Sequence, residues 1–159
     1  MIAVGDRLPK STLVKATSDG PEAIDTEDYF RGRRVALFAV PGAFTPTCSA
    51  AHLPSFVNRL GELKGRGVDE VACTAVNDAF VLDAWGRQAG AEGVTMLADG
   101  NGHFAEALGL SADSSKFGMG TRSRRYAMLV NDGVVEQVHV EAPGEFKVSS
   151  ADHLLATMT

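Results

Sequence analysis

The sequence has little cysteine, no long hydrophobic run and no cluster of basic residues at its start. Two cysteines in 159 residues are too few for a disulfide scaffold and are typical of a reducing compartment, so we expect a cytoplasmic protein. No apolar run reaches the length of a membrane span. Residues 1–7 lack a cationic stretch followed by an apolar segment, so we also expect no targeting segment.

Excess positive charge is missing as well. The net charge is −5 and there is no basic stripe, which argues against nucleic acid or an anionic membrane as the main partner. His103, His139 and His153 are scattered without ligand spacing, so neither a metal nor a cofactor is expected. With 45% hydrophobic and 22% charged residues, the chain fits one globular domain over residues 1–159.

Apolar strand patterns alternate with helical ones, which predicts an α/β fold. Core strands are expected at 33–40, 68–76 and 94–98, and an edge strand at 11–17. Asn131-Asp132-Gly133 predicts a hairpin turn between strands at 125–130 and 134–140. The Ser/Gly-rich stretch 111–123 is expected to be a mobile or functional loop.

Helices are expected wherever a capping residue precedes an apolar periodicity. Asp25 or Thr26 caps a short helix, Asn77-Asp78 caps the next, and Ser149 or Ser150 caps the last one. The apolar positions that mark the longer helices are Leu53, Phe56, Val57, Leu60 and Leu63 in the first, Phe80, Val81, Ala84 and Trp85 in the second, and Leu154, Leu155 and Met158 in the last.

Cys48 stands at the most informative place in the chain. It follows the apolar strand 33–40, and Thr45-Pro46 predicts an N-cap followed by proline at the first helical position. Cys48 then falls in the first helical turn, where free backbone N–H groups and the positive end of the helix dipole favour a thiolate. The sulfur is therefore expected to be a nucleophile.

Four blocks carry a resemblance to a known family. PGAF (41–44), TPTCSAAHLP (45–54), VACTAVND (71–78) and RRYAMLVNDG (124–133) together resemble the peroxiredoxins, in particular the type II or peroxiredoxin-5-like branch. The resemblance covers nearly the whole chain. It implies a thioredoxin-like fold with a central mixed sheet flanked by helices, and an antioxidant enzyme that reduces hydrogen peroxide or alkyl hydroperoxides.

The resemblance also implies roles for individual residues. Cys48 would become a sulfenic acid, Thr45 would offer its hydroxyl, and the N–H groups of Thr47 and Cys48 would face the peroxide. Pro41 would shield the thiolate from water, and by family position the cation would be Arg125. Without the family, the choice among Arg122, Arg124 and Arg125 stays open, because such a cluster is usually a solvated face.

Three more side chains have two or more interpretations. His52, four residues after Cys48, is either a general base or, as we favour, a structural hydrogen-bonding group. Phe44 and Phe117 either line an apolar peroxide pocket, form a dimer contact, or pack in the core. The family commonly forms dimers, so a homodimer is expected.

Cys73 decides how the sulfenic acid is recycled. Its strand is expected to be covered on both faces, where a thiol is normally inert. Members of the branch nevertheless often carry a second cysteine at this interval, and it is sometimes proposed as the residue that resolves the sulfenic acid. A Cys48–Cys73 bond needs Cα atoms within about 7 Å and an unwound first turn, which Pro54 makes separable.

The C-terminal resolving cysteine of animal-type relatives is absent from 146–150. The interpretation is a one-cysteine mechanism with an external thiol, either glutathione with glutaredoxin or thioredoxin. Two rival classes remain open: a cysteine hydrolase using His52 or His139, and a non-enzymatic redox-sensing module.

Overall fold

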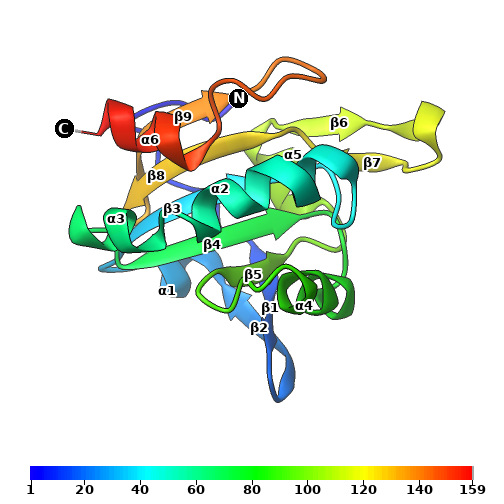
Figure 1. The fold of residues 1–159 in the computed structure, drawn as a ribbon, viewed down its shortest axis with the longest axis horizontal. Helices are drawn as coiled ribbons and strands as arrows, with labels where there is room; N and C mark the ends of the chain where they lie inside the picture. The colour runs from blue at the N-terminus through cyan, green and yellow to red at the C-terminus, as the bar shows by residue number, and fades with distance from the viewer. Residues whose placement is uncertain (159) are drawn as a thin grey trace.

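The computed structural model describes residues 1–158 and contains a central seven-stranded mixed sheet (Figure 1). Strands β3, β4 and β5 are parallel to one another, and the remaining neighbours pair antiparallel. From edge to edge the sheet contains β2 (Gly20–Asp25), β1 (Thr12–Thr17), β5 (Thr95–Ala98), β4 (Glu70–Ala75), β3 (Arg34–Ala39), β8 (Tyr126–Asn131) and β9 (Val134–Val140).

Helices cover both faces of this sheet, each over its own apolar cluster. Phe56, Trp85 and Leu154 belong to one cluster, and Phe30 and Phe104 belong to the other. The first face is covered by α2 (Leu53–Val57), α3 (Leu60–Gly65), α4 (Ala79–Gln88) and α6 (Ala151–Thr157), and the second by α1 (Thr26–Phe30) and α5 (His103–Leu108). No helix among residues 1–158 is both long and apolar enough to cross a membrane.

Strand β3 is central because both of its faces are apolar. Residues 35–39 are fully buried, and alternate side chains enter the two clusters. Its partner β4 places Cys73 opposite Phe38. The expected core strands are thus confirmed, and the end of β3 leads directly into the segment that contains Cys48.

The expectation for residues 11–17 was right about the strand and wrong about its place. β1 lies inside the sheet between β2 and β5, and the edge strand is β2, which the sequence pattern did not reveal. β2 contains Pro21 and Glu22 and has no buried residue, so it lacks the apolar alternation that marks a strand.

Two expected helices differ from the structure. The apolar stripe from Leu53 to Leu63 belongs to two short helices, because Asn58 and Arg59 form a turn and Arg59 leaves helical geometry (φ −117°, ψ 13°). In α4 the buried face carries Leu82 and Trp85, whereas Phe80 is 72% exposed. The predicted face of α4 was therefore wrong for Phe80.

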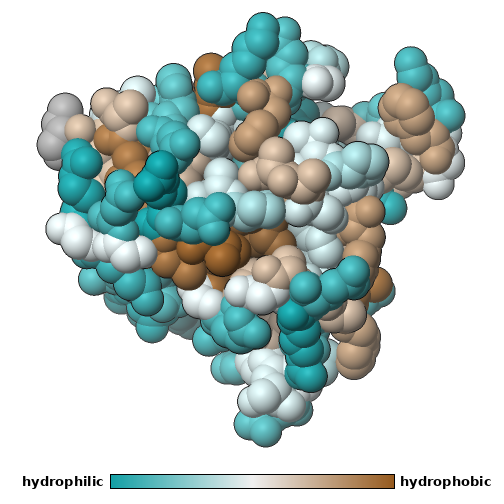
Figure 2. Space-filling view, in the orientation of Figure 1, coloured by the Kyte–Doolittle hydropathy of each residue, from teal (hydrophilic) through white to brown (hydrophobic). Residues whose placement is uncertain are grey.

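The stretch 111–123 is not a loop. It forms β6 (Ser111–Asp113), a 3₁₀ turn (Ser115–Phe117) and β7 (Thr121–Ser123), which pair as an antiparallel hairpin. This hairpin projects from the body of the molecule, at the upper right of Figure 1. Figure 2 shows hydrophobic residues on the hairpin and a hydrophobic patch below α2.

The predicted hairpin turn and the caps of three helices are confirmed. Asp132 (φ 51°) and Gly133 (φ 81°) both have positive φ between β8 and β9, as a type I′ turn requires. The side chains of Asp25, Asp78 and Ser150 each accept a backbone N–H at the start of α1, α4 and α6.

Candidate active site

Cys48 lies in the first turns of the helix that follows β3. The helix begins at Pro46, and from Cys48 to His52 it widens into a π-helix, in which the N–H of Leu53 donates to the carbonyl of Cys48. π-Turns of this kind are frequent at functional sites. The Cys48 side chain is fully buried.

Thr45 precedes this helix as predicted, but its side chain does something else. Its carbonyl accepts the N–H of Ser49 at 3.0 Å, as the residue before a helix should. Its hydroxyl donates to the carbonyl of Gly42 at 2.6 Å. The lone pairs of the Thr45 oxygen therefore remain available as acceptors.

Arg125 reaches the sulfur of Cys48 from the residue just before β8. Its Nη2 lies 3.1 Å from Cys48 Sγ, and its Nη1 lies 2.8 Å from Nδ1 of His52. The guanidinium also lies over the ring of Phe146, with its carbon 5.9 Å from the ring centre. One planar group thus holds the sulfur and the imidazole together.

The two neighbouring arginines point elsewhere. Arg122 donates to the carbonyls of Met119 and Val76, and Arg124 donates to the carbonyl of Glu141. The structure therefore separates the three arginines that the sequence left equivalent.

His52 is buried between two partners. Its Nε2 lies 2.9 Å from the carbonyl of Ser149, so Nε2 carries the proton and Nδ1 accepts from Arg125. Burial, together with the charge of Arg125, lowers the pKa of His52 to about 3. The lone pair of Nδ1 already accepts from Arg125, so His52 has no free lone pair with which to act as a base. His139 bonds to Gln137 on β9 and packs its ring against His153.

A cavity of about 520 Å³ lies beside Arg125, the residue that contacts the buried sulfur. Pro41, Thr45, Thr47 and Arg125 line it together with Phe117 of the β6–β7 hairpin. The cavity is therefore lined by both polar and apolar groups.

Phe44 lies outside the lining of this cavity, with 49% of its surface exposed and a positive φ of 64°. Phe117 is 71% exposed. Neither ring packs in the core, so the core-packing interpretation was wrong for both. The reason is local: Phe44 sits in a tight turn before the helix, and Phe117 at the tip of the projecting hairpin.

Cys73 belongs to the same apolar cluster as Cys48, and both thiols are free. Cys73 is fully buried on β4. Burial first, and then the neighbouring Cys48, raise the pKa of the Cys73 thiol well above its ordinary value, although Arg125 acts in the opposite direction. Cys73 is thus a thiol that stays protonated.

Sequence reasoning missed Glu141. Its carboxylate is 3% exposed and accepts the N–H groups of residues 147–149 and the hydroxyl of Ser149. The available signal was a single acidic residue directly after the strand 134–140 and before an Ala-Pro-Gly turn. A lone carboxylate there gave no reason to connect it with Cys48.

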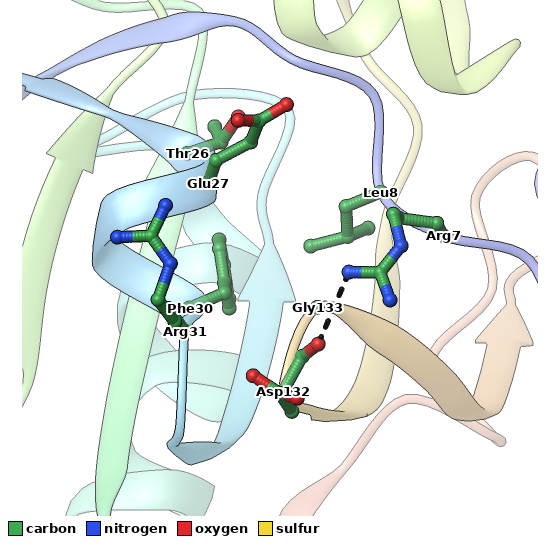
Figure 3. Close-up of a pocket in the computed structure, with 8 residues that line it drawn as sticks. All are labelled: Arg7, Leu8, Thr26, Glu27, Phe30, Arg31, Asp132 and Gly133. Atoms are coloured by element: carbon green, nitrogen blue, oxygen red, sulfur yellow. Dashed lines mark hydrogen bonds between the residues drawn. The ribbon is translucent and has the colours of Figure 1, made fainter.

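A second cavity, of about 440 Å³, lies away from this site (Figure 3). It is bordered by α1 and the β8–β9 turn, where Arg7 donates to the carbonyl of Asp132. It contains none of the predicted site residues. Within residues 1–158, no three His, Cys, Asp or Glu side chains come together as metal ligands.

The fold and the buried, arginine-bound cysteine together define a class of thiol-based redox proteins. The family model described as Redoxin matches residues 3–155. The chain belongs to the peroxiredoxins, in the branch that contains peroxiredoxin-2 and peroxiredoxin 5 proteins.

Relatives and solved structures agree on this family. The chain is 45% identical to peroxiredoxin-2E, chloroplastic, of Arabidopsis thaliana, over 99% of this chain and 69% of that protein. It is 45% identical to peroxiredoxin-2B of the same plant, over 99% and 98% of the two chains.

Two solved structures extend the agreement to the fold. Reduced Prx3 of Vibrio vulnificus, in complex with H₂O₂, superposes with a TM-score of 0.95 at 51% identity, over 98% of each chain. Peroxiredoxin 5 of Alvinella pompejana gives 0.87 at 37% identity, over 98% of this chain and 97% of that one. The expected thioredoxin-like fold is confirmed, and the protein is a thiol-dependent peroxidase.

Proposed function

We propose that Cys48 is the peroxidatic cysteine and that Arg125 holds both its thiolate and the incoming hydroperoxide. The observation that carries this proposal is the 3.1 Å contact between Arg125 Nη2 and the fully buried Cys48 Sγ. A guanidinium donor against sulfur stabilises the anion, which is the nucleophilic form of a thiol. Burial keeps water away from that anion.

The reaction balances when the proton that the Cys48 thiol releases on ionisation is returned, through solvent, to the departing oxygen. The thiolate sulfur attacks the terminal oxygen of the hydroperoxide, an S–O bond forms, and the O–O bond breaks. Sulfur is oxidised to sulfenic acid, and the departing oxygen leaves as water or an alcohol after it takes up a proton. The charge that develops on the departing oxygen needs donors already in place.

Thr45, Thr47 and Pro41 complete the proposed site around the cavity. The Thr45 hydroxyl donates to Gly42, so its lone pair accepts the O–H of the peroxide and orients it. The N–H groups of Thr47 and Cys48 lie in the first turn of the helix, where backbone donors have no partner within the helix. Pro41 lines the cavity and covers the thiolate.

The cavity accepts both hydrogen peroxide and alkyl hydroperoxides. Thr45 and Arg125 supply polar groups to its lining, and Phe117 and Met119 supply apolar surface. A volume of about 520 Å³ exceeds what hydrogen peroxide alone requires.

An external thiol recycles the enzyme in this proposal. A first thiol attacks the sulfenic acid and releases water, which leaves a mixed disulfide, and a second thiol reduces that disulfide. Glutathione with glutaredoxin, or thioredoxin, supplies these thiols. The buried, protonated Cys73 argues against the alternative, in which Cys73 resolves Cys48.

Intact mass spectrometry tests both the chemistry and the number of cysteines used. One equivalent of peroxide without reductant should add about one oxygen atom to the protein, and glutathione should then form a mixed disulfide on Cys48. Cys48→Ser should abolish both products, and Cys73→Ser should retain them. A loss of two hydrogens with a Cys48–Cys73 crosslink would instead establish the two-cysteine mechanism.

We further propose that the protein is a homodimer of a reducing compartment such as the cytoplasm. Exposed Phe44 and Phe117 supply apolar surface for a second copy, and two free cysteines suit reducing conditions. Light scattering on the purified protein should give twice the chain mass of 16.7 kDa, and Phe117→Ser should lower it.

A further inference from the structure

Glu141 carries a buried carboxylate that the chemistry above does not use. It follows β9 and is 3% exposed. Its Oε2 accepts the N–H groups of Lys147, Val148 and Ser149, each at 2.8 Å, and the Ser149 hydroxyl at 2.6 Å. The carboxylate therefore fixes the backbone of residues 147–149 against the end of the sheet.

These bonds require the ionised carboxylate. Burial alone would raise the pKa of Glu141, but the hydrogen bonds from the Ser149 hydroxyl and from the three backbone N–H groups outweigh it and hold the pKa below its ordinary value. A carboxylate that only accepts is the group that satisfies four converging donors.

The carbonyl group of Ser149 contacts the active site. Its carbonyl accepts Nε2–H of His52 at 2.9 Å, and this bond determines which ring nitrogen of His52 carries the proton. Nδ1 of His52 then accepts from Nη1 of Arg125 at 2.8 Å, and Nη2 of Arg125 contacts Cys48 Sγ at 3.1 Å. A continuous series of hydrogen bonds thus runs from Glu141 to the sulfur.

Glu141 is also connected to Arg125 directly, through the main chain. The N–H of Glu141 donates to the carbonyl of Arg125 at 3.0 Å, so the same residue holds the backbone of Arg125 and, through Ser149 and His52, its guanidinium. The ring of Phe146 packs against His52, with ring centres 5.0 Å apart, and closes the space beside them.

We infer that Glu141 is a positioning residue for Arg125, acting through the Ser149 carbonyl and the His52 tautomer. The inference rests on the proposed function, because it assigns Arg125 the task of holding the thiolate and the peroxide. Glu141 touches no reacting atom. Without it, residues 147–149 lose their anchor, His52 loses its fixed proton acceptor, and Nδ1 no longer accepts from Arg125 in every molecule.

The first test compares two carboxylates on the same segment of chain. Glu141→Gln places an N–H₂ group among N–H donors, whereas Glu136→Gln changes an exposed partner of Arg34. We expect Glu141→Gln to slow the peroxide-dependent step about tenfold or more, since small displacements of a positioned group have large effects on rate. Glu136→Gln should react like the parent protein, and equal rates for all three proteins would overturn the inference.

A double-mutant cycle separates positioning from simple loop stability. His52→Ala removes the link, so adding Glu141→Gln to it should cause no further loss of rate. Losses that multiply would show that Glu141 acts independently of His52 and would overturn the inference. If Glu141→Gln does not fold, Ser149→Ala takes its place in the cycle; it removes the 2.6 Å bond and keeps the carbonyl.

The ¹⁵N shifts of the His52 ring decide the question without any turnover. The parent protein should show Nε2 protonated and Nδ1 bare, and Glu141→Gln should show a mixture of tautomers. An unchanged tautomer in Glu141→Gln would overturn the inference. If the parent protein itself failed to reduce peroxide, the proposed function would fail, and this spectrum would still test the role of Glu141.

Discussion

In the proposed mechanism single side chains give this site its reactivity, and Arg125 is the clearest example. Its two terminal nitrogens bond to different partners, Cys48 and His52, which requires a planar fork with fixed spacing. A lysine supplies the same charge from one atom. Charge alone is therefore not what the position requires.

Arg125→Lys should consequently lose most of the activity. Removal of a donor to a developing oxyanion costs about 3 kcal/mol, so the peroxide-dependent step should slow by roughly two orders of magnitude. Stopped-flow measurement of that step checks it. Arg124→Lys, at a side chain that bonds only to the carbonyl of Glu141, should have a much smaller effect. Equal losses at both positions would mean that the catalytic charge has been assigned to the wrong arginine.

The neutral state of His52 should make stability depend on pH. Burial, and then Arg125, lower its folded-state pKa from 6.5 to about 3, so above pH 6.5 the proton is bound in neither state. As pH falls below 6.5, the unfolded chain binds the proton and the folded chain does not, so the free energy of unfolding falls, by at most about 1.4 kcal/mol per pH unit.

Urea unfolding between about pH 6 and pH 4 measures this dependence. His52→Ala should show a shallower fall over the same range, because the contributions of the other acidic and histidine side chains are common to both proteins. Parallel curves would mean that His52 is protonated in the folded protein.

At the scale of elements, the π-helix that contains Cys48 is hydrogen-bonded to a natural fluorescent reporter, Trp85. Trp85 on α4 is the only tryptophan in the sequence, and its Nε1–H donates to the hydroxyl of Ser49 at 3.0 Å. Ser49 is the residue after Cys48, so unwinding of this turn separates the pair. The widened turn and Pro54, which has no N–H, make this the part of the helix with the least regular hydrogen bonding.

Tryptophan emission should therefore distinguish local oxidation from unwinding. With one equivalent of peroxide we expect a small change that glutathione reverses, that is absent in Cys48→Ser and that persists in Cys73→Ser. Ser49→Ala shows how large the change is when the hydrogen bond is lost. A change of that size in the parent protein, but not in Cys73→Ser, would mean that the turn opens to form a disulfide.

At the scale of the whole molecule, the stability resides in the two clusters on either side of the sheet. Phe38 of β3 and Phe56 of α2 stack with ring centres 4.1 Å apart, and both are fully buried. This contact attaches the helix that follows Cys48 to the central strand. Loss of packing here affects both the fold and the site.

Phe56→Ala should lower the free energy of unfolding by about 3–5 kcal/mol, as removal of a buried phenyl ring leaves a cavity. Phe80→Ala is the matched control, because the same atoms are removed from a ring that is 72% exposed, and it should change stability by no more than about 0.5 kcal/mol. Urea unfolding of the two variants measures both. Similar losses in the two would mean that Phe80 is covered in solution.

The sequence by itself determined the local features and the family. The strand before Cys48, the proline that begins its helix, the Asp132-Gly133 turn and the caps at Asp78 and Ser150 depend on residues within a few positions of one another. Neighbouring residues and hydrogen bonds set such features directly. The four motif blocks gave the family.

Only the tertiary structure decided which long-range partners meet. The choice of Arg125 over its neighbours depends on the direction of one side chain at the start of β8, across 77 residues from Cys48. Glu141 and Ser149 contact the site through a chain reversal after β9, and no local pattern encodes that contact. Likewise β1 lies inside the sheet because β2 pairs beside it. These results depend on packing, and packing is a property of the whole chain.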